Sequence, residues 1–456
     1  MNKEEKNSNK CPICGRPTHK ESKYCIFHAS AEEKTKEEFE QALKEYIKEI
    51  KKEDKGYNFK GFVFVGDINF NNIEFNEDPK FINAKFIYGS ISFIGTRFEE
   101  KTSFLGVLFN GSVNFSKASF QKEVEFKGVK FEGGPTFFKD VSFSGDVVFQ
   151  GNFFRNDIDF RGAIFHGNFN CSFDKFNGSE INFNCADINH NFDICLTEKN
   201  HLNLNFESIT TYFAFTNIKI IVKNGGISFR NTLLDKISLC FEIYNDSYVD
   251  FEGARIKDTV FRRDHIEGYI IQENKKSYDK AKEIYITLKN NFHSIGRYDD
   301  ESWAFKKEKD MERKSNCHFK TLHKWLWSCF LNAIYGYGEK PWNVVIAAGV
   351  VILFSALLFS LIGIGNPEII ELKGIAVHQN SGNIFDLASK GLLKNNVIRN
   401  FPDSLYFSAI TFTTLGYGDF RPLEGWGRIL AGSEAFIGAF MMALFVYTFA
   451  RRTGGR

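Results

Sequence analysis

Apolar side chains recur every five or six residues across the first half of the chain. From Phe70 onward, Phe residues stand 11 or 12 positions apart, and a second series lies five residues after the first. The first series is Phe70, Phe81, Phe93, Phe104, Phe115, Phe126, Phe138, Phe149 and Phe160, and the second is Phe75, Phe86, Phe98, Phe109, Phe120, Phe131, Phe143, Phe154 and Phe165. A short fixed period predicts stacked repeats that each bury an apolar face on the next. A period of five does not fit an α-helix, which repeats about every 3.6 residues.

The position two residues before most of these Phe carries a small or β-branched side chain. Examples are Ala84, Thr96, Val107, Val113, Ala118, Val124, Val129, Val147, Ile158 and Ala163. The unit V-x-F-x-x-A-x-F-x-x-x resembles the Phe-rich variant of the pentapeptide-repeat family over residues 57–262. The resemblance implies a right-handed quadrilateral β-helix in which the Phe and the small residues point inward.

An 11-residue unit implies about 22 residues per coil, with one extra residue at every second corner. Nine such coils, about 4.8 Å apart, predict a rod roughly 40 Å long. The spacing becomes irregular after Phe176, although Phe229 and Phe251 again stand one coil length apart. Cys171 and Cys240 fall where a Phe is expected, so both are predicted to be core residues rather than metal ligands.

Two stretches flanking the repeat have helical periodicity. Residues 31–56 predict a charged amphipathic helix with one apolar stripe, formed by Phe39, Leu43, Tyr46, Ile47 and Ile50. Two heptads are few for a coiled coil, so packing on a neighbouring domain is favoured. Residues 263–316 predict a helical hairpin that caps the β-helix and breaks at Gly296. The buried face of its first helix is expected to contain Ala281, Ile284, Tyr285, Leu288 and Phe292.

The C-terminal part of the chain has the composition of a membrane domain. Residues 317–342 combine Trp, Phe and Leu with basic side chains, which predicts a helix at a membrane interface; a buried amphipathic helix is the alternative. Residues 343–365 and 426–449 are two apolar runs long enough to span a bilayer. Within the second run, Glu434 is expected to form a structural hydrogen bond to a pore helix rather than to bind ions.

The segment between the two spans carries a short, distinctive motif. Residues 401–419 read FPDSLYFSAITFTTLGYGD. This closely resembles the pore of tetrameric potassium channels, whose selectivity filter reads T-V-G-Y-G-D. The resemblance assigns the filter to Thr414, Leu415, Gly416, Tyr417 and Gly418, with Leu in place of the family's Val. It implies a homotetramer in a lipid bilayer, with potassium as the permeant ion, because each chain supplies one carbonyl oxygen per ring.

The resemblance also assigns residues that support the filter. Pro402 begins a helix, so residues 404–413 are expected to form the pore helix. Tyr406 can hydrogen-bond Asp419 behind the filter, and Thr413 precedes it. Gly438 lies where the family often places an inner-helix hinge, and a small residue at a helix contact is the alternative.

The first thirty residues carry two closely spaced pairs of soft ligands. Cys11 and Cys14 are separated by two residues, as are Cys25 and His28. Each spacing lets two side chains converge on one ion, which predicts a closed, structural zinc site in a module of residues 1–30. The segment is too short to fold on a core of its own, so metal binding would supply its folding energy. A redox role for Cys11 and Cys14 is an alternative.

Composition excludes several other classes of protein. The net charge is +2, and residues 60–262 carry 21 basic and 25 acidic side chains, a net of −4. This disfavours the strongly acidic DNA mimicry of some soluble pentapeptide-repeat proteins, so no nucleic-acid partner is expected. The sequence shows no nucleophile–base constellation and no phosphate loop, so an enzyme is not expected. A weakly selective cation channel remains the rival function.

The expected location is the inner (plasma) membrane, with both termini in the cytoplasm. Nine Cys, an odd number, and a polar N-terminus without a secretory signal indicate a reducing compartment. The β-helix is then expected to assemble or to regulate the pore from the cytoplasm, in response to an unknown ligand or protein. Force would enter the first span through residues 265–342.

Overall fold

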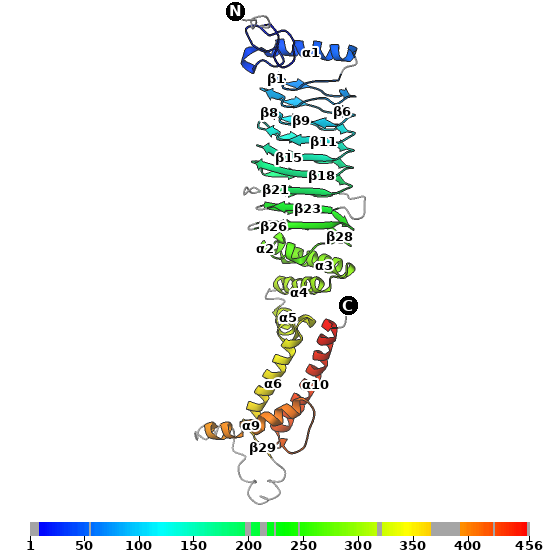
Figure 1. Cartoon of the computed structure of the whole chain (residues 1–456). Coiled ribbons are helices and arrows are strands. Elements are labelled where there is room, and N and C mark those ends of the chain that lie inside the picture. Colours follow the sequence, from blue (N-terminus) through cyan, green and yellow to red (C-terminus); the bar gives the residue numbers. More distant parts are fainter. Residues whose placement is uncertain are drawn as a thin grey trace, which may run out of the picture. The chain divides into compact units, whose positions relative to one another are not determined.

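A computed structural model describes residues 9–53, 56–196, 202–209, 217–222, 225–244, 247–316, 322–365, 393–422 and 425–453. The chain divides into two compact units, Met1–Met311 and Glu312–Arg456. The first unit is a β-helix with a cap at each end, and the second is a set of packed helices (Figure 1).

Short parallel strands stack along the faces of the β-helix. One sheet has the order β1 (Val63–Val65), β4 (Lys85–Ile87), β8 (Leu108–Phe109), β12 (Lys130–Phe131), β15 (Val147–Phe154), β18 (Phe169–Phe176), β21 (Phe192–Leu196), β23 (Asn217–Val222) and β26 (Ser238–Ile243), with β7 (Thr102–Ser103) and β11 (Val124–Lys127) joined to it. The second contains β2 (Ile68–Asn69), β5 (Ile91–Ser92), β9 (Val113–Asn114), β13 (Thr136–Phe137), β16 (Ile158–Asp159), β19 (Glu180–Asn182), β22 (Leu202–Asn205), β24 (Gly225–Ser228) and β27 (Tyr248–Asp250). The third contains β3 (Glu74–Phe75), β6 (Arg97–Phe98), β10 (Ser119–Phe120), β14 (Ser142–Phe143), β17 (Ile164–Phe165) and β20 (Asp187–Ile188), and β25 (Leu233–Asp235) pairs with β28 (Arg255–Lys257).

The strand register confirms the predicted coil length. Lys85 pairs with Val63 in the coil before it and with Leu108 in the coil after it. The first of these steps equals two repeat units, and the second is longer by one residue. The alternation places one extra residue in every second coil. The second sheet is nine strands deep, which corresponds to about eight turns of the chain.

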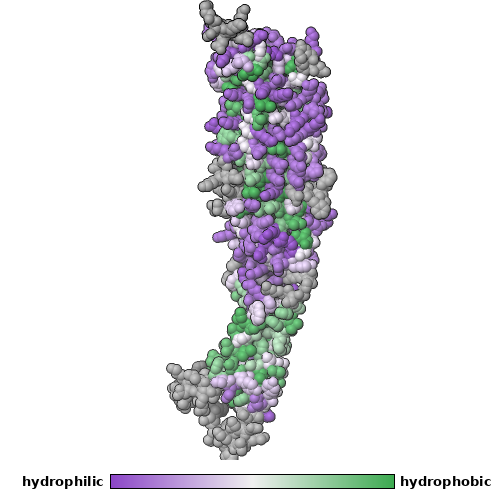
Figure 2. Space-filling model, viewed as in Figure 1, coloured by the Kyte–Doolittle hydropathy of each residue, from purple (hydrophilic) through white to green (hydrophobic). Residues whose placement is uncertain are grey.

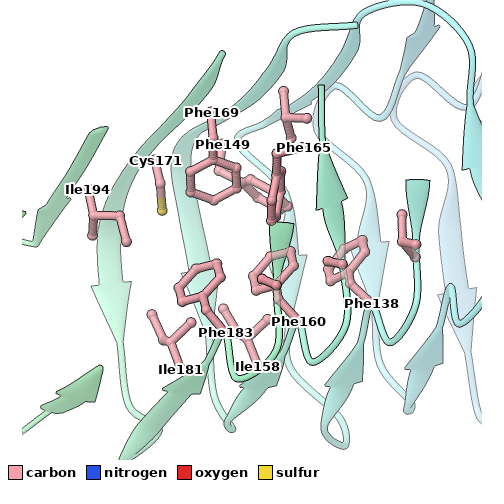
Figure 3. Close-up of a cluster of buried hydrophobic side chains, with 14 of the residues drawn as sticks. Phe138, Phe149, Ile158, Phe160, Phe165, Phe169, Cys171, Ile181, Phe183 and Ile194 are labelled. Atoms are coloured by element: carbon pink, nitrogen blue, oxygen red, sulfur yellow. The ribbon is translucent and has the colours of Figure 1, made fainter. Parts of the chain in front are cut away.

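Phe rings fill the interior in stacked columns, as predicted. Phe138 and Phe160 stack with ring centroids 4.8 Å apart, and Phe160 and Phe183 with centroids 4.9 Å apart. Figure 3 shows these three rings side by side in successive coils. The small residues two positions before the Phe residues are buried as well. The hydroxyl group of Thr96 donates to the carbonyl oxygen of Phe70, and this hydrogen bond offsets the cost of burying the hydroxyl group.

Left-handed residues occur at regular corners of the coils. Positive φ angles of 53–68° recur once in every repeat unit, at Asn72, Asn83, Gly95, Gly106, Lys117, Gly128, Asp140, Gly151 and Gly162. This is the period of the predicted extra residue. Gly and Asn tolerate the left-handed region best, which explains their frequency at these corners.

The core slot expected for Cys240 is filled by another residue. Cys171 pairs with Phe149 and is buried, which confirms that prediction. The strand pairing instead aligns Phe241 with Ile220, so the buried residue is Phe241 and Cys240 is only half-buried. The step from Ile220 to Phe241 is one residue shorter than two repeat units, which brings Phe241 rather than Cys240 to the inside of this sheet. The next sheet keeps the regular step, since Ile227 pairs with Val249.

The N-terminal cap consists of the 3-10 turn η1 (Ala31–Glu33) and α1 (Lys36–Glu53). The helix begins five residues later than predicted because Thr35 and Glu38 form a capping box: the Thr35 amide donates to Glu38 Oε2, and the Glu38 amide donates to Thr35 Oγ1. Four of the five residues of the predicted stripe are fully buried, and Ile47 packs beside them. The Phe39 ring meets Phe64 of the first coil, so the stripe covers the open end of the β-helix.

The opposite end is covered by η2 (Arg263–His265), α2 (Ile271–Asn274), α3 (Tyr278–Ser294) and α4 (Tyr298–Ser315). All five residues predicted for the inner face of α3 are buried. The buried Asn291 side chain accepts from the Thr259 amide and donates to the Thr259 carbonyl oxygen, both at 2.8 Å, so it replaces the next strand of the coil. Gly296 has a φ of 72° at the turn of the hairpin, as expected.

The second unit contains the two candidate membrane spans. Its elements are α5 (Leu322–Tyr335), η4 (Gly336–Gly338), α6 (Pro341–Ile362), β29 (Ile364–Gly365), α9 (Leu393–Phe412), β30 (Arg421–Pro422) and α10 (Trp426–Thr453), and β29 pairs antiparallel with β30. Helices α6 and α10 are long and apolar enough to cross a membrane. Figure 2 shows mainly hydrophobic residues on the visible surface of these helices, in contrast to the polar β-helix.

The pore helix is longer than predicted. Helix α9 begins at Leu393 and runs through Pro402, whereas the sequence placed its start at Pro402. A proline removes the hydrogen bond to the residue four positions earlier and crowds the carbonyl group of that residue, which makes a start at Pro402 the local expectation. The C-terminal end, Phe412, agrees with the prediction to within one residue.

Candidate functional site: the segment after the pore helix

The predicted filter follows directly from the end of α9. The amide of Leu415 donates to the carbonyl oxygen of Ile410, and the amide of Thr414 donates to that of Thr411, both at 3.0 Å. These bonds end the helix and start an extended segment. The filter residues are therefore positioned by the last turn of α9.

The backbone of this segment alternates in conformation. Thr414, Gly416 and Gly418 have positive φ angles of 58°, 55° and 82°. Leu415 and Tyr417, which lie between them, do not have positive φ angles. Alternation of this kind can turn successive carbonyl groups toward one side. Glycine adopts positive φ without cost, but Thr414 does so with a β-carbon, which the sequence did not indicate.

The filter side chains are exposed in the single chain. Leu415 is 61% exposed and Tyr417 is 69% exposed. Irregular backbone at membrane depth is stable only where protein covers it or where it lines a water-filled path. The exposed segment therefore requires further protein around it.

The predicted support residues lie beside the filter. The Thr413 hydroxyl donates to the carbonyl oxygen of Ala409 at 2.7 Å. The Tyr406 hydroxyl interacts with the carboxylate of Asp419, and its ring lies 6.0 Å from that of Phe420. The structure thus brings Tyr406 and Asp419 together next to the predicted filter.

Gly438 lies where α10 contacts the end of the pore helix. A β-carbon at this position would lie 1.9 Å from the carbonyl oxygen of Phe412, which is far inside van der Waals contact. A residue larger than glycine would force α9 and α10 apart. This geometry favours the close-contact role of Gly438 over a hinge.

Glu434 lies one helical turn before Gly438 and faces the same way. Its Oε1 atom is 2.5 Å from the hydroxyl oxygen of Ser408 on α9, which confirms the predicted hydrogen bond to the pore helix. The sequence did not identify Ser408 as the partner of Glu434, because a serine in an apolar helix is common without such a role. The spacing of Glu434 one helical turn before Gly438 was the signal that this face of the helix contacts another helix.

The four N-terminal ligand residues converge in space. Their ligand atoms all lie within 4.8 Å of one another. The Sγ atoms of Cys14 and Cys25 are 3.4 Å apart, and His28 Nδ1 lies 3.2 Å from Cys25 Sγ and 3.7 Å from Cys11 Sγ. These separations match those between ligands around a tetrahedral zinc ion, whose bonds are about 2.0–2.3 Å. Three Cys and one His therefore fit zinc.

A second layer of contacts orients the predicted zinc ligands. His28 Nε2 lies 3.0 Å from the carbonyl oxygen of Lys60, which fixes Nε2 as the protonated nitrogen and leaves Nδ1 free to ligate. The neighbouring Phe27 stacks on Phe62 of the first coil with ring centroids 4.7 Å apart. Within residues 9–53, the predicted metal module is thus part of the cap on the β-helix.

A buried lysine joins the same cap, and no pattern in the sequence indicated it. Lys34 Nζ donates to the carbonyl oxygens of Ile26 and Val63, and it lies 4.6 Å from the centre of the Phe39 ring. Burial lowers the pKa of Lys34 to about 7. The side chain ties the loop after Cys25 to strand β1.

Two families of known proteins match parts of the chain. The family described as ion channel matches residues 374–454, and the family described as pentapeptide repeats (9 copies) matches residues 93–137. The potassium voltage-gated channel protein shk-1 of Caenorhabditis elegans is 40% identical over 50 residues, which is 11% of this chain. The match covers 9% of that relative's length. No solved structure matches the chain significantly.

Together, the fold and these matches define the class of protein. The chain carries pentapeptide repeats on a β-helix, followed by an ion-channel domain with two helices able to span a membrane. The ion-channel match indicates a channel rather than an enzyme.

Proposed function

We propose that this protein is a tetrameric potassium-selective channel whose filter is Thr414 to Gly418. The observation that carries the proposal is the alternation of left-handed φ angles along this segment. A dehydrating potassium ion needs successive rings of oxygen in place of its water shell, and four chains with carbonyls turned inward supply them. The relative named a potassium channel supports the choice of ion.

Four copies also account for the exposure of the filter. Leu415 and Tyr417 are exposed in one chain, as are Phe436 and Phe440 on α10. Neighbouring subunits and lipid would cover these apolar surfaces, since the backbone of the filter cannot face lipid. The tetramer follows from the number of oxygens that each ring requires.

A weakly selective cation channel is the second candidate. Leu415 replaces the Val of the family's motif and adds bulk behind the filter. Only the backbone carbonyl of this residue would contact ions, so we favour potassium selectivity. The test is ion flux from liposomes that contain the purified full-length protein, with sodium compared with potassium at equal gradients. Equal rates for the two ions would support the weakly selective channel.

We propose that the ligand cluster at residues 11–28 holds one structural zinc ion. Cys11, Cys14, Cys25 and His28 would together fill the four positions of a tetrahedral ion, so no position would remain open for catalysis. Bound zinc would hold together a loop region that has little core of its own. Phe27 and Lys34, which contact the first coil, would then hold this loop region against the β-helix.

We propose that α5 lies at the membrane surface and that the β-helix and both termini are cytoplasmic, at the inner (plasma) membrane. Leu326, Trp327 and Phe330 on α5 are each more than half exposed, which disfavours the alternative of a buried helix. The basic residues Lys320, His323 and Lys324, which suit such a surface, lie outside the residues whose side chains the structure describes. The Trp and basic residues of this segment would suit the lipid headgroup region.

The β-helix would regulate or assemble the pore through the segment before the first span. Arg451 at the end of α10 forms an ion pair with Glu339, immediately before α6, at 3.2 Å. The end of the inner helix is thereby joined to the corner that precedes α6. A displacement of this corner would reach both spans, whereas an assembly role would need no displacement. An unknown regulatory ligand or protein would act through the same corner.

A further inference from the structure

A buried carboxyl group joins three helices of the channel domain. Glu434 on α10 is 2% exposed, and its Oε1 atom lies 2.5 Å from the hydroxyl oxygen of Ser408 on α9. That hydroxyl oxygen is also 2.9 Å from the carbonyl oxygen of Ile352 on α6. The Ser408 side chain is fully buried, so neither contact is shared with bulk water. The other carboxyl oxygen, Oε2, has no hydrogen-bond partner among the described residues.

Counting hydrogens distinguishes the two charge states of Glu434. A serine hydroxyl carries one hydrogen, and here it is in contact with two oxygen atoms. If the carboxyl group is ionised, only one of these contacts can be a hydrogen bond, and the other sets two oxygens against each other. If the carboxyl group is protonated, it donates to Ser408, and Ser408 donates to Ile352. Only the protonated form satisfies both contacts.

The described surroundings of Glu434 contain no charge that would stabilise the ionised form. Helix α6 contains no charged residue. Its Ser355 hydroxyl interacts with the carboxyl group, but it is a neutral group and supplies no charge. The charged residues of the other two helices are Lys394, Arg399 and Asp403 on α9 and Arg428, Arg451 and Arg452 on α10. The nearest in sequence, Asp403 and Arg428, are five and six residues from Ser408 and Glu434. Among the side chains that the structure describes, none of them pairs with Glu434. An unpaired buried charge is costly, whereas a neutral acid with a partner is not.

We propose that Glu434 is held as the neutral carboxylic acid and positions the pore helix through a two-bond relay to Ser408 and Ile352. The relay fixes α9 between α6 and α10, one turn from the contact at Gly438. Glu434 is a positioning residue, because it acts on the filter through the pore helix and does not face the ions. The filter then keeps its geometry only while Glu434 retains its proton.

The charge state can be measured directly by infrared spectroscopy on the full-length protein in liposomes at neutral pH. The difference spectrum between the wild type and Glu434→Gln should contain the carbonyl stretch of a protonated carboxylic acid. Ser408→Ala should move this band, because the acid loses its acceptor. Carboxylate bands in place of the acid band would overturn the proposal. This measurement does not depend on which ion the channel conducts.

The positioning role can be tested on the same variants by tetramer melting and by flux. Glu434→Gln keeps an N–H donor toward Ser408 and should retain wild-type melting and ion preference, with a flat response to rising pH. Glu434→Ala and Ser408→Ala should each lower the melting temperature and weaken the ion preference. The proposal is wrong if Glu434→Gln lowers the melting temperature and the ion preference as much as Glu434→Ala does. A neutral amide that donates a hydrogen bond should be able to replace a neutral acid that donates one. The flux readout rests on the proposed channel function, whereas the melting and infrared readouts do not.

Discussion

At the scale of single residues, left-handed backbone conformation recurs in both units. Asn and Gly turn the corners of the β-helix, and Gly416 and Gly418 alternate along the filter. A β-carbon in this region of φ costs about 1–2 kcal/mol per residue, so the residue type is closely tied to the geometry. Thr414 is an exception in the filter, with a φ of 58°.

Gly418→Ala should abolish the preference for potassium over sodium. The new β-carbon opposes a φ of 82° at a cost of about 1–2 kcal/mol in each chain, so the segment should leave the conformation that aligns its carbonyl oxygens. The permeability ratio in liposomes measures the effect. Gly349→Ala on α6 is the matched control, because glycine there has an ordinary φ and open space around it. An unchanged ratio in Gly418→Ala would refute the assignment of the filter.

Gly438→Ala should destabilise the channel domain by about 1–3 kcal/mol, as expected for overpacking. The added carbon would meet the Phe412 carbonyl oxygen at 1.9 Å and displace the end of the pore helix. Gly432→Ala on the same helix is the control, because no atom of the chain lies within 4 Å of a β-carbon there, and it should leave the stability unchanged. Tetramer melting compares the two variants. Equal stability with altered gating would instead support a hinge at Gly438.

At the scale of elements, the β-helix is held by side chains that repeat from coil to coil. Each Phe in a column contacts the ring above and the ring below it, so the energy is spread along the rod. The two ends lack one neighbour and are closed by α1 and α3. The caps are therefore needed for the same physical reason as the repeats, which is the burial of apolar surface.

Phe138→Ala should destabilise the β-helix by about 3–5 kcal/mol, because it leaves a cavity in a closed column. Phe137 is the adjacent residue, but it points outward and is only half-buried, so Phe137→Ala should cost far less. Hydrogen exchange of the full-length protein would report faster exchange in the coils around Phe138 in the first variant only. Similar exchange in both variants would contradict the stacked-column account.

Removal of zinc should loosen the N-terminal cap. Metal analysis should find about one zinc per chain, and Cys14→Ser should lose it, because a tetrahedral site needs all four ligands. Cys185→Ser is the matched control, since Cys185 is exposed at a corner of the β-helix away from the ligand cluster. Limited proteolysis after chelation should cleave first within residues 9–53. Full zinc content in Cys14→Ser would refute the assignment.

At the scale of the whole molecule, a rod without a hinge in its repeats is joined to a channel domain. Its continuous columns suit a lever, a spacer or a docking surface better than a sensor that changes shape. A passive scaffold for assembly is the plain alternative. The two differ in whether the open probability depends on the rod.

Deletion of the rod separates regulation from assembly. Residues 1–262 are the repeat region, but α3 buries its inner face against the last coil, so a deletion that ends there would expose Leu288 and Phe292. Deletion of residues 1–315 removes the hairpin with the rod. If regulation is the role, the truncated channel should form tetramers whose open probability no longer responds to the stimuli that move the full-length channel. Unchanged responses would support a scaffold.

The sequence by itself determined those features that depend on period and residue type. The Phe spacing predicted the coil length, because a repeat must bury the same residue at each level. The TTLGYGD motif predicted where the filter lies, and its glycines Gly416 and Gly418 adopt the left-handed conformation there at little cost. The two Cys and His pairs predicted a cluster of ligands, because a two-residue spacer brings side chains together.

The tertiary structure alone decided what depends on neighbours far apart in the chain. Phe241 takes the core slot in place of Cys240 because one step between strands of this sheet is a residue shorter, which local spacing does not reveal. Helix α9 continues through Pro402, although its local pattern indicates a start there. Ser408, Glu434 and Ile352 meet because three helices pack at one depth, and only that packing shows that one hydroxyl group contacts two oxygen atoms.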